Sequence, residues 1–162
     1  MATAARTESR ESRRLDAWVS FLRSHAAITR ELSAQLQREH GLTISDYEVL
    51  LHLSRADGGM LRRVDLAERV VLSASGITRL LEGLERAGWV ERASCKSDAR
   101  VSYAKLTEKG RRKLREAAVT HVAGVDELFN DRYSESELAT LAGLLARLPL
   151  TGADCSSSSS CG

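Results

Sequence analysis

Residues 72–92 read LSASGITRLLEGLERAGWVER and describe one helix with two different faces. Ser73 suits an N-cap and Gly88 suits a C-terminal glycine, so the pattern predicts a helix from Ser73 to Arg86. One face is apolar at helical spacing: Ala74, Ile77, Leu80, Leu81 and Leu84. The opposite face is small and polar: Ser75, Thr78, Arg79 and Glu82. Short hydroxyl side chains let a helix enter a groove of DNA, and an arginine can form two hydrogen bonds with guanine.

The segments on both sides of this helix complete a recognisable unit. Downstream, residues 89–92 and 101–106 are strand-like and enclose a polar tip at residues 93–100, which predicts a hairpin. Upstream, a short helix beginning near residue 45, a brief strand at residues 60–62 and a helix at residues 64–70 lead into a tight turn. Two short helices joined by a tight turn and followed by a hairpin are typical of a winged helix-turn-helix.

Longer helices are expected at both ends of the chain. Residues 12–38 carry an apolar stripe without Gly or Pro, and Ser45 to Glu48 form a capping-box pattern for the next helix. Thr107 begins a helix that runs to Phe129, and a second capping box at residues 134–137 begins another that ends before Pro149. We therefore expect a flexible arm at residues 1–11, a single domain at residues 12–149 and a disordered Ser-rich tail at residues 150–162.

The predicted fold class is mainly α with a small β-wing (α+β). The winged helix-turn-helix occupies about residues 45–106, and the helices at about residues 12–38 and 107–149 flank it. The apolar stripes of these flanking helices must be buried, either within one chain or against a second copy. A two-fold dimer would place two reading helices about 34 Å apart, which matches an inverted repeat in DNA.

Charge is distributed unevenly along the 162 residues. Residues 60–115 hold 14 Lys and Arg against 7 Asp and Glu, whereas the whole chain has a net charge of only +2. A basic segment within a near-neutral chain is the pattern expected of a polyanion-binding unit. No apolar run is long enough to span a membrane, and the start MATAARTESRESRR lacks the apolar stretch of a secretory signal, so we expect a cytoplasmic protein.

Several other classes are disfavoured. The sequence has no nucleophile–base arrangement, phosphate-cradling glycine loop or Cys/His cluster, so we expect neither an enzyme nor a cofactor or metal site. His52 and His121 are isolated histidines without visible partner ligands. Cys155 and Cys161 lie in the Ser-rich tail, where a reducing compartment would keep them as free thiols.

The helix and hairpin together resemble the MarR family of bacterial transcriptional regulators. The similarity rests on residues 72–92, on Asp98-Ala99-Arg100 in the hairpin and on Leu106-Thr107-Glu108-Lys109-Gly110, and it extends over residues 12–149. This resemblance implies a homodimer that binds a palindromic operator in double-stranded DNA and is released by a small ligand or by thiol oxidation. Many members have two arginines after the hairpin aspartate, whereas this chain has Ala99 in the first of these positions.

The expected DNA contacts come from the helix, the short strand and the hairpin tip. They are Arg62, Ser73, Ser75, Gly76, Thr78, Arg79, Lys96, Asp98 and Arg100. We expect Arg79 to read a base and Arg100 to contact the backbone.

A small aromatic acid is the expected effector, and its candidate binding residues lie on the first helix: Arg14, Trp18, Arg23 and His25. Two alternatives remain. Cys95 beside Lys96 could act as a redox-sensing thiol, because a nearby cation lowers a thiol pKa. Alternatively, Gly76 and Ala99 could mark a ligand-binding dimer that no longer reads a DNA sequence.

Overall fold

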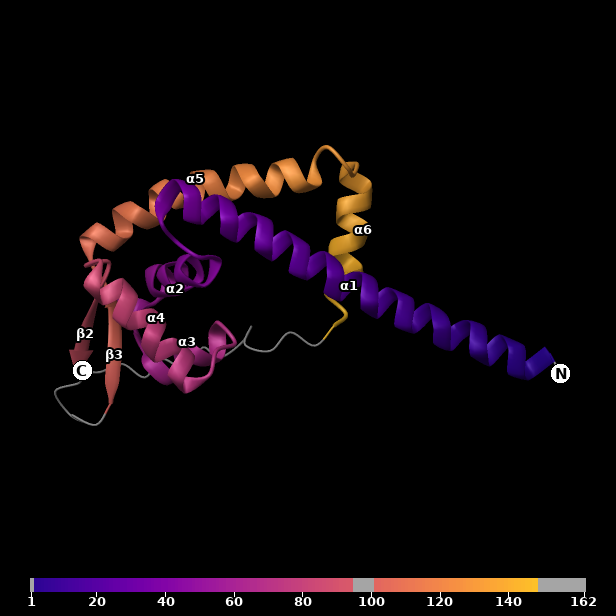
Figure 1. The fold of residues 1–162 in the computed structure, drawn as a ribbon, viewed down its shortest axis with the longest axis horizontal. Helices are drawn as coiled ribbons and strands as arrows, with labels where there is room; N and C mark the ends of the chain where they lie inside the picture. Colours follow the sequence, from indigo (N-terminus) through magenta and orange to yellow (C-terminus); the bar gives the residue numbers. More distant parts are fainter. Residues whose placement is uncertain (1, 95–100, 149–162) are drawn as a thin grey trace.

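The computed structural model describes residues 2–94 and 101–148, with side chains described from residue 12 onward. In chain order the elements are α1 (Ala2–His40), α2 (Ile44–Arg55), the 3-10 turn η1 (Asp57–Gly59), β1 (Met60–Arg62), α3 (Arg63–Arg69), α4 (Ala74–Arg86), β2 (Val90–Ser94), β3 (Ser102–Leu106), α5 (Glu108–Phe129) and α6 (Glu135–Leu145). The predicted fold class is confirmed. Figure 1 shows α2 to α4 and the hairpin gathered near one end of the long helix α1, with α5 running beside that same end.

The three strands form one small antiparallel sheet with β3 in the centre. Leu61 of β1 pairs with Ala104 of β3, and Val90 of β2 pairs with Leu106 of β3. Val90, Ala104 and Leu106 are almost fully buried, so the base of the hairpin is part of the core. This hairpin, β2 and β3, is called the wing below.

A threonine hydroxyl fixes the wing to α4 and α5. The Oγ1 of Thr107 lies 2.8 Å from the carbonyl oxygen of Gly88 and 3.1 Å from that of Trp89, and it accepts a hydrogen bond of 3.0 Å from the amide of Gly110. A Cβ atom on Gly110 would overlap the Trp89 carbonyl. Only glycine therefore lets α5 begin this close to the wing, which gives the Leu106-Thr107-Glu108-Lys109-Gly110 pattern a structural reason.

One apolar core joins all the elements from α1 to α5. Its largest fully buried side chains are almost all leucines: Leu36, Leu42, Leu50, Leu53, Leu66, Leu81 and Leu84, with Val49. Leu114 and Ala117 of α5 belong to the same cluster. By contrast, α6 has no buried residue, and residues 12–27 of α1 are exposed.

Three helices end in the same way, with a residue in the left-handed conformation one or two positions after the last helical residue. Gly41 after α1 has a φ of 68° and Gly88 after α4 has a φ of 72°. Val71 after α3 has a φ of 53°, and it is the one non-glycine residue with a positive φ among the described residues. At this turn the Val71 amide donates to the Glu68 carbonyl and the Leu72 amide donates to the Ala67 carbonyl, which is the hydrogen-bond pattern of a Schellman motif.

The structure corrects some of the predicted boundaries. Helix α1 begins at Ala2 rather than at residue 12, so residues 2–11 are helical where we expected an arm, and their Ala-, Arg- and Glu-rich sequence without Gly or Pro favours that state. The capping box of α2 is formed by Thr43 and Asp46 rather than by Ser45 and Glu48. The chain reverses immediately at Gly41 and buries Leu42, which leaves Thr43 in the cap position.

Other predicted features have mixed outcomes. The N-caps Ser73 and Thr107 and the second capping box, Ser134 with Glu137, are confirmed. Helix α6 ends at Leu145 rather than just before Pro149, and Ala74 is exposed although the pattern placed it on the apolar face. The predicted tail at residues 150–162 lies outside the described residues.

Replacing Val71 with asparagine should stabilise the protein. A left-handed backbone costs an L-residue about 1–2 kcal/mol and is worst for a β-branched side chain, whereas asparagine tolerates it. We expect Val71→Asn to raise the free energy of unfolding by about 1 kcal/mol in urea titrations followed by circular dichroism. Val64→Asn is the matched control, because Val64 is also exposed but lies within helix α3. A Val71→Asn protein that is less stable than the parent would contradict the strained turn.

Candidate nucleic-acid interface

Helix α4 presents the predicted polar face to solvent. Ser75, Thr78 and Arg79 are exposed, whereas Ile77, Leu81 and Leu84 on the other side are buried in the core. Glu82 and Arg86 continue the exposed face toward the end of the helix. Sequence reasoning missed Arg86, although its position seven residues after Arg79 follows from the helical repeat.

Hydrogen bonds within the chain leave the Ser75 and Thr78 hydroxyl groups with different capacities to bond to an outside partner. The Thr78 hydroxyl donates to the Ala74 carbonyl at 2.8 Å, so outward it offers acceptor lone pairs and a methyl group. The Ser75 hydroxyl lies 3.2 Å from that of Ser73, and either can be the donor. Arg79 makes no ion pair or hydrogen bond with another residue in the described part of the chain, so its guanidinium is available to an outside acceptor.

Ser73 and Gly76 have a structural role at the start of α4. The Ser73 hydroxyl accepts a hydrogen bond of 3.1 Å from the Gly76 amide, which is the N-cap interaction. A Cβ atom on Gly76 would lie 3.2 Å from this hydroxyl, so a larger residue would press on the cap. Gly76 is therefore half-buried beside the cap, three residues before Arg79.

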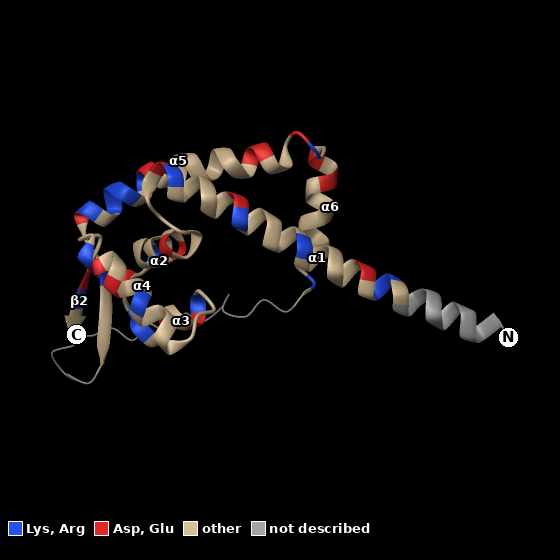
Figure 2. Ribbon diagram, in the orientation of Figure 1, with Lys and Arg blue, Asp and Glu red and all other residues tan. Residues whose placement is uncertain are grey.

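The other predicted DNA contacts lie on β1 and at the wing tip. Arg62 donates from Nε to the Asp65 carboxylate at 2.7 Å, so a phosphate would have to compete with this ion pair. The hydrogen bond with Asp65 raises the pKa of Arg62. Lys96, Asp98 and Arg100, together with Cys95 and Ala99, lie outside the described residues. Figure 2 shows Lys and Arg on α3, α4 and the start of α5.

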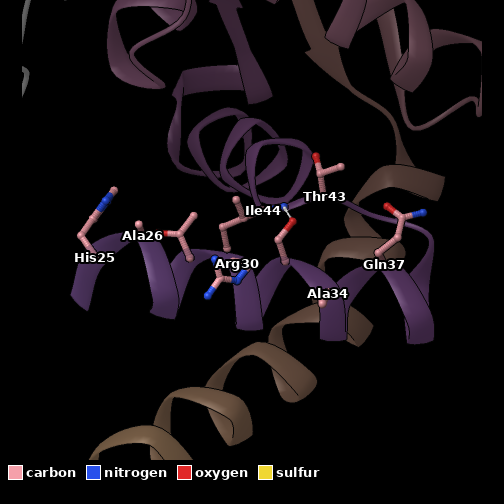
Figure 3. A pocket seen from close by; sticks show the side chains of 9 residues that line it. His25, Ala26, Arg30, Ala34, Gln37, Thr43 and Ile44 are labelled. Carbon is pink, nitrogen blue, oxygen red and sulfur yellow. Dashed lines mark hydrogen bonds between the residues drawn. The ribbon is translucent and has the colours of Figure 1, made fainter. Parts of the chain in front are cut away.

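A second feature is an open cavity of about 640 Å³ between α1 and the start of α2. It is lined by His25, Ala26, Thr29, Arg30, Ser33, Ala34, Gln37, Thr43 and Ile44. Figure 3 shows Thr43 and Ile44 across from the α1 residues, and the Ile44 amide donates to the Ser33 hydroxyl at 3.2 Å. His25 also acts on α2: burial raises the pKa of Glu48, and the nearby His25 opposes this shift. The volume lies within the range of small-molecule sites.

Of the predicted ligand-binding residues, only His25 lines this cavity. Trp18 is 56% exposed and stacks on Phe21 at a ring distance of 6.2 Å, and Phe21 in turn lies 6.3 Å from the His25 ring. Arg14 and Arg23 are nine residues apart, about 180° around the helix, so they do not face one ligand together. Arg30 is the arginine that lines the cavity. The sequence did not indicate Arg30, because the cavity exists only where the start of α2 lies against α1.

The described residues contain no group of three or more His, Cys, Asp or Glu side chains able to hold a metal ion. Within the same residues, no helix is long and apolar enough to cross a membrane.

Comparisons with known proteins agree with this geometry. The MarR family profile matches residues 40–101. An uncharacterised HTH-type transcriptional regulator of Bacillus cereus is 30% identical over 118 residues, which are 73% of this chain and 77% of the relative. The structure of AbsC, a MarR family transcriptional regulator from Streptomyces coelicolor, is 36% identical with a TM-score of 0.73, covering 81% of this chain and 88% of AbsC.

A further solved structure is that of Sco3205, a MarR family transcriptional regulator from Streptomyces coelicolor, in complex with DNA. It is 30% identical with a TM-score of 0.74, and the alignment covers 80% of this chain and 81% of Sco3205.

Replacing Arg79 with alanine should weaken DNA binding and relax specificity at one base pair. A base-reading arginine contributes about 1–3 kcal/mol of discrimination, which fluorescence anisotropy with a set of single-base duplex variants can measure. Arg112→Ala is the matched control, because Arg112 is exposed on α5 rather than on α4. Equal DNA affinity and specificity of the Arg79→Ala protein and the parent would contradict a role of the α4 face in reading DNA.

Proposed function

The chain belongs to the MarR family of DNA-binding transcriptional regulators, which are not enzymes, and on that premise we propose that it is a homodimeric repressor. It binds a palindromic operator and is released by a small aromatic or phenolic carboxylate. Since it acts on the chromosome, it works in the cytoplasm.

The exposed face of α4 is the observation that carries the DNA-binding part of this proposal. Ser75 and Thr78 are small enough for the helix to seat deeply, and Arg79 is free to reach a base. Binding to a duplex that carries the upstream region of the protein's own gene should fall steeply with salt, because Lys and Arg contacts release counterions from DNA. No binding to any duplex, or equal binding to every duplex, would favour a dimer that has lost sequence-specific DNA binding.

The terminal helices support the homodimer. Leu15, Trp18 and Leu22 on α1 and Leu144 and Leu145 on α6 are exposed, although they are large and apolar. Helix α6 has only 11 residues and buries none of them, and an isolated helix of that length is marginal in water. A second copy would bury both surfaces, and burial of one leucine side chain is worth about 1.5–3 kcal/mol. Two-fold symmetry also suits an inverted repeat in the operator.

Placing a charge on α6 should dissociate the dimer. We expect Leu144→Glu to lower the mass measured by light scattering from twice 17.7 kDa toward 17.7 kDa at micromolar concentration. The same change at Val64, which is exposed on α3, should leave the mass unchanged. A parent protein that is already monomeric would contradict the homodimer.

The cavity between α1 and α2 supports the effector part of the proposal. Ala26, Ala34 and Ile44 supply apolar surface for a ring, and Arg30 supplies a cation for a carboxylate. The ligand would touch α1 on one side and the first turn of α2 on the other, so it can favour one position of the winged unit relative to α1. A ligand shifts such an equilibrium only through unequal affinity for the two states.

Salicylate should bind this cavity, and it should bind more weakly when the protein holds operator DNA. By reciprocity, the factor by which DNA weakens salicylate equals the factor by which salicylate weakens DNA, and each tenfold factor is about 1.4 kcal/mol. Calorimetric titration with and without operator measures this factor. Arg30→Ala should weaken salicylate at least about tenfold, because a hydrogen bond to a charged group is lost.

Arg14→Ala is the control for this experiment, because Arg14 lies on the same helix about 24 Å from Arg30. If Arg14→Ala weakens salicylate binding and Arg30→Ala does not, the binding residues predicted from the sequence are favoured over the cavity. Equal salicylate affinity with and without operator DNA would contradict the proposed release of DNA by this ligand.

A further inference from the structure

Val71 occupies a position where the rest of the chain uses glycine. The turns after α1 and α4 place Gly41 and Gly88 in the left-handed conformation, and the turn after α3 places Val71 there. A β-branched residue is poorly suited to this conformation, because its Cβ crowds the neighbouring carbonyl. Glycine at position 71 would form the same hydrogen bonds without this strain.

Packing does not explain the valine either. Val71 is 81% exposed, so its two methyl groups lie in solvent rather than in the core. Val64 and Val71 are the two large apolar side chains that are exposed in the described parts of residues 42–106. A residue that is strained and also unburied is a candidate for function, since strained positions concentrate at functional sites.

The position of Val71 indicates which partner it would contact. The residue lies in the turn of the helix-turn-helix, two residues before the N-cap Ser73 of α4. In this motif the N-terminal end of the second helix approaches the base edges in the major groove. We propose that Val71 contacts the 5-methyl group of a thymine in the operator and so helps to determine its sequence. This inference rests on the proposed DNA-binding function.

The chemistry of the major groove favours this partner. The 5-methyl of thymine is the apolar group that the base pairs present there, whereas the other edge groups are hydrogen-bond donors and acceptors that a valine cannot satisfy. A β-branched side chain also has few rotamers, so it loses little freedom on contact. The left-handed turn holds this stiff apolar group outside the core, immediately before Ser73 and Ser75.

A double-mutant cycle between the protein and the DNA tests the proposal. The probe is a duplex selected from random sequence by the parent protein, with each thymine replaced in turn by deoxyuridine, which removes only the methyl group. One such replacement should weaken the parent about fourfold, and Val71→Ala should weaken binding to the unmodified duplex about fivefold to tenfold. The deoxyuridine effect should disappear in the Val71→Ala protein, because the two changes remove one shared contact.

Val64→Ala serves as the control, since it removes the same two methyl groups from an exposed valine of the same unit. It should keep the full deoxyuridine effect. Thermal unfolding of Val71→Ala should occur at or above the parent temperature, so a loss of binding cannot come from misfolding. Equal affinity of the parent and Val71→Ala for the selected duplex would overturn the proposal. An equal loss of affinity at every thymine replaced by deoxyuridine would also overturn it. Either result would leave the proposed DNA-binding function intact. Failure of the parent to select any duplex would overturn both.

Discussion

The structure depends on burying one leucine-rich core to which α1 and α5, far apart in the sequence, both contribute. Leu36 of α1 and Leu114 of α5 belong to the same buried cluster as Leu66 of α3 and Leu81 of α4. Cores are close-packed, so one element cannot move without repacking its neighbours. Polar and aromatic contacts reinforce the link: the rings of Tyr47 on α2 and His121 on α5 lie 4.6 Å apart, and burial lowers the pKa of His121. Helix α4 and the long helices α1 and α5 are therefore mechanically connected within one chain.

That core also determines which side chains remain free for function. Because Ile77, Leu81 and Leu84 hold α4 from inside, the outer face of α4 keeps a fixed orientation whatever residues it carries. Its hydroxyl groups are further oriented by bonds to their own helix, as for Thr78 with the Ala74 carbonyl. Such preorganisation lowers the entropy lost on binding. The Thr107 hydroxyl does the same for the wing, since it ties the base of the hairpin to the end of α4.

Much of this arrangement was predictable from local signals. Ser73, Thr107 and Gly88 are caps whose physical requirements lie within four residues, so the sequence alone located them correctly. The cavity was not predictable, because Arg30 and Ile44 meet only after α1 and α2 have packed. The strain at Val71 was not predictable either, because a valine in sequence suggests a strand or a core position, and its positive φ is visible only in the folded structure.

The division of the apolar surface explains how a small ligand could reach a distant DNA face. The leucine core leaves α6 and residues 12–27 of α1 uncovered, so a second copy would bind the part of α1 that the winged unit does not contact. The spacing of two reading helices would then be set by the angle between α1 and α2, and the cavity at Ile44 lies at that joint. A change of a few degrees there would be amplified over the length of the domain, whereas the same change within the core would require leucines to leave their packed positions. A ligand at this joint would therefore alter the spacing of the two helices without disturbing the packed core.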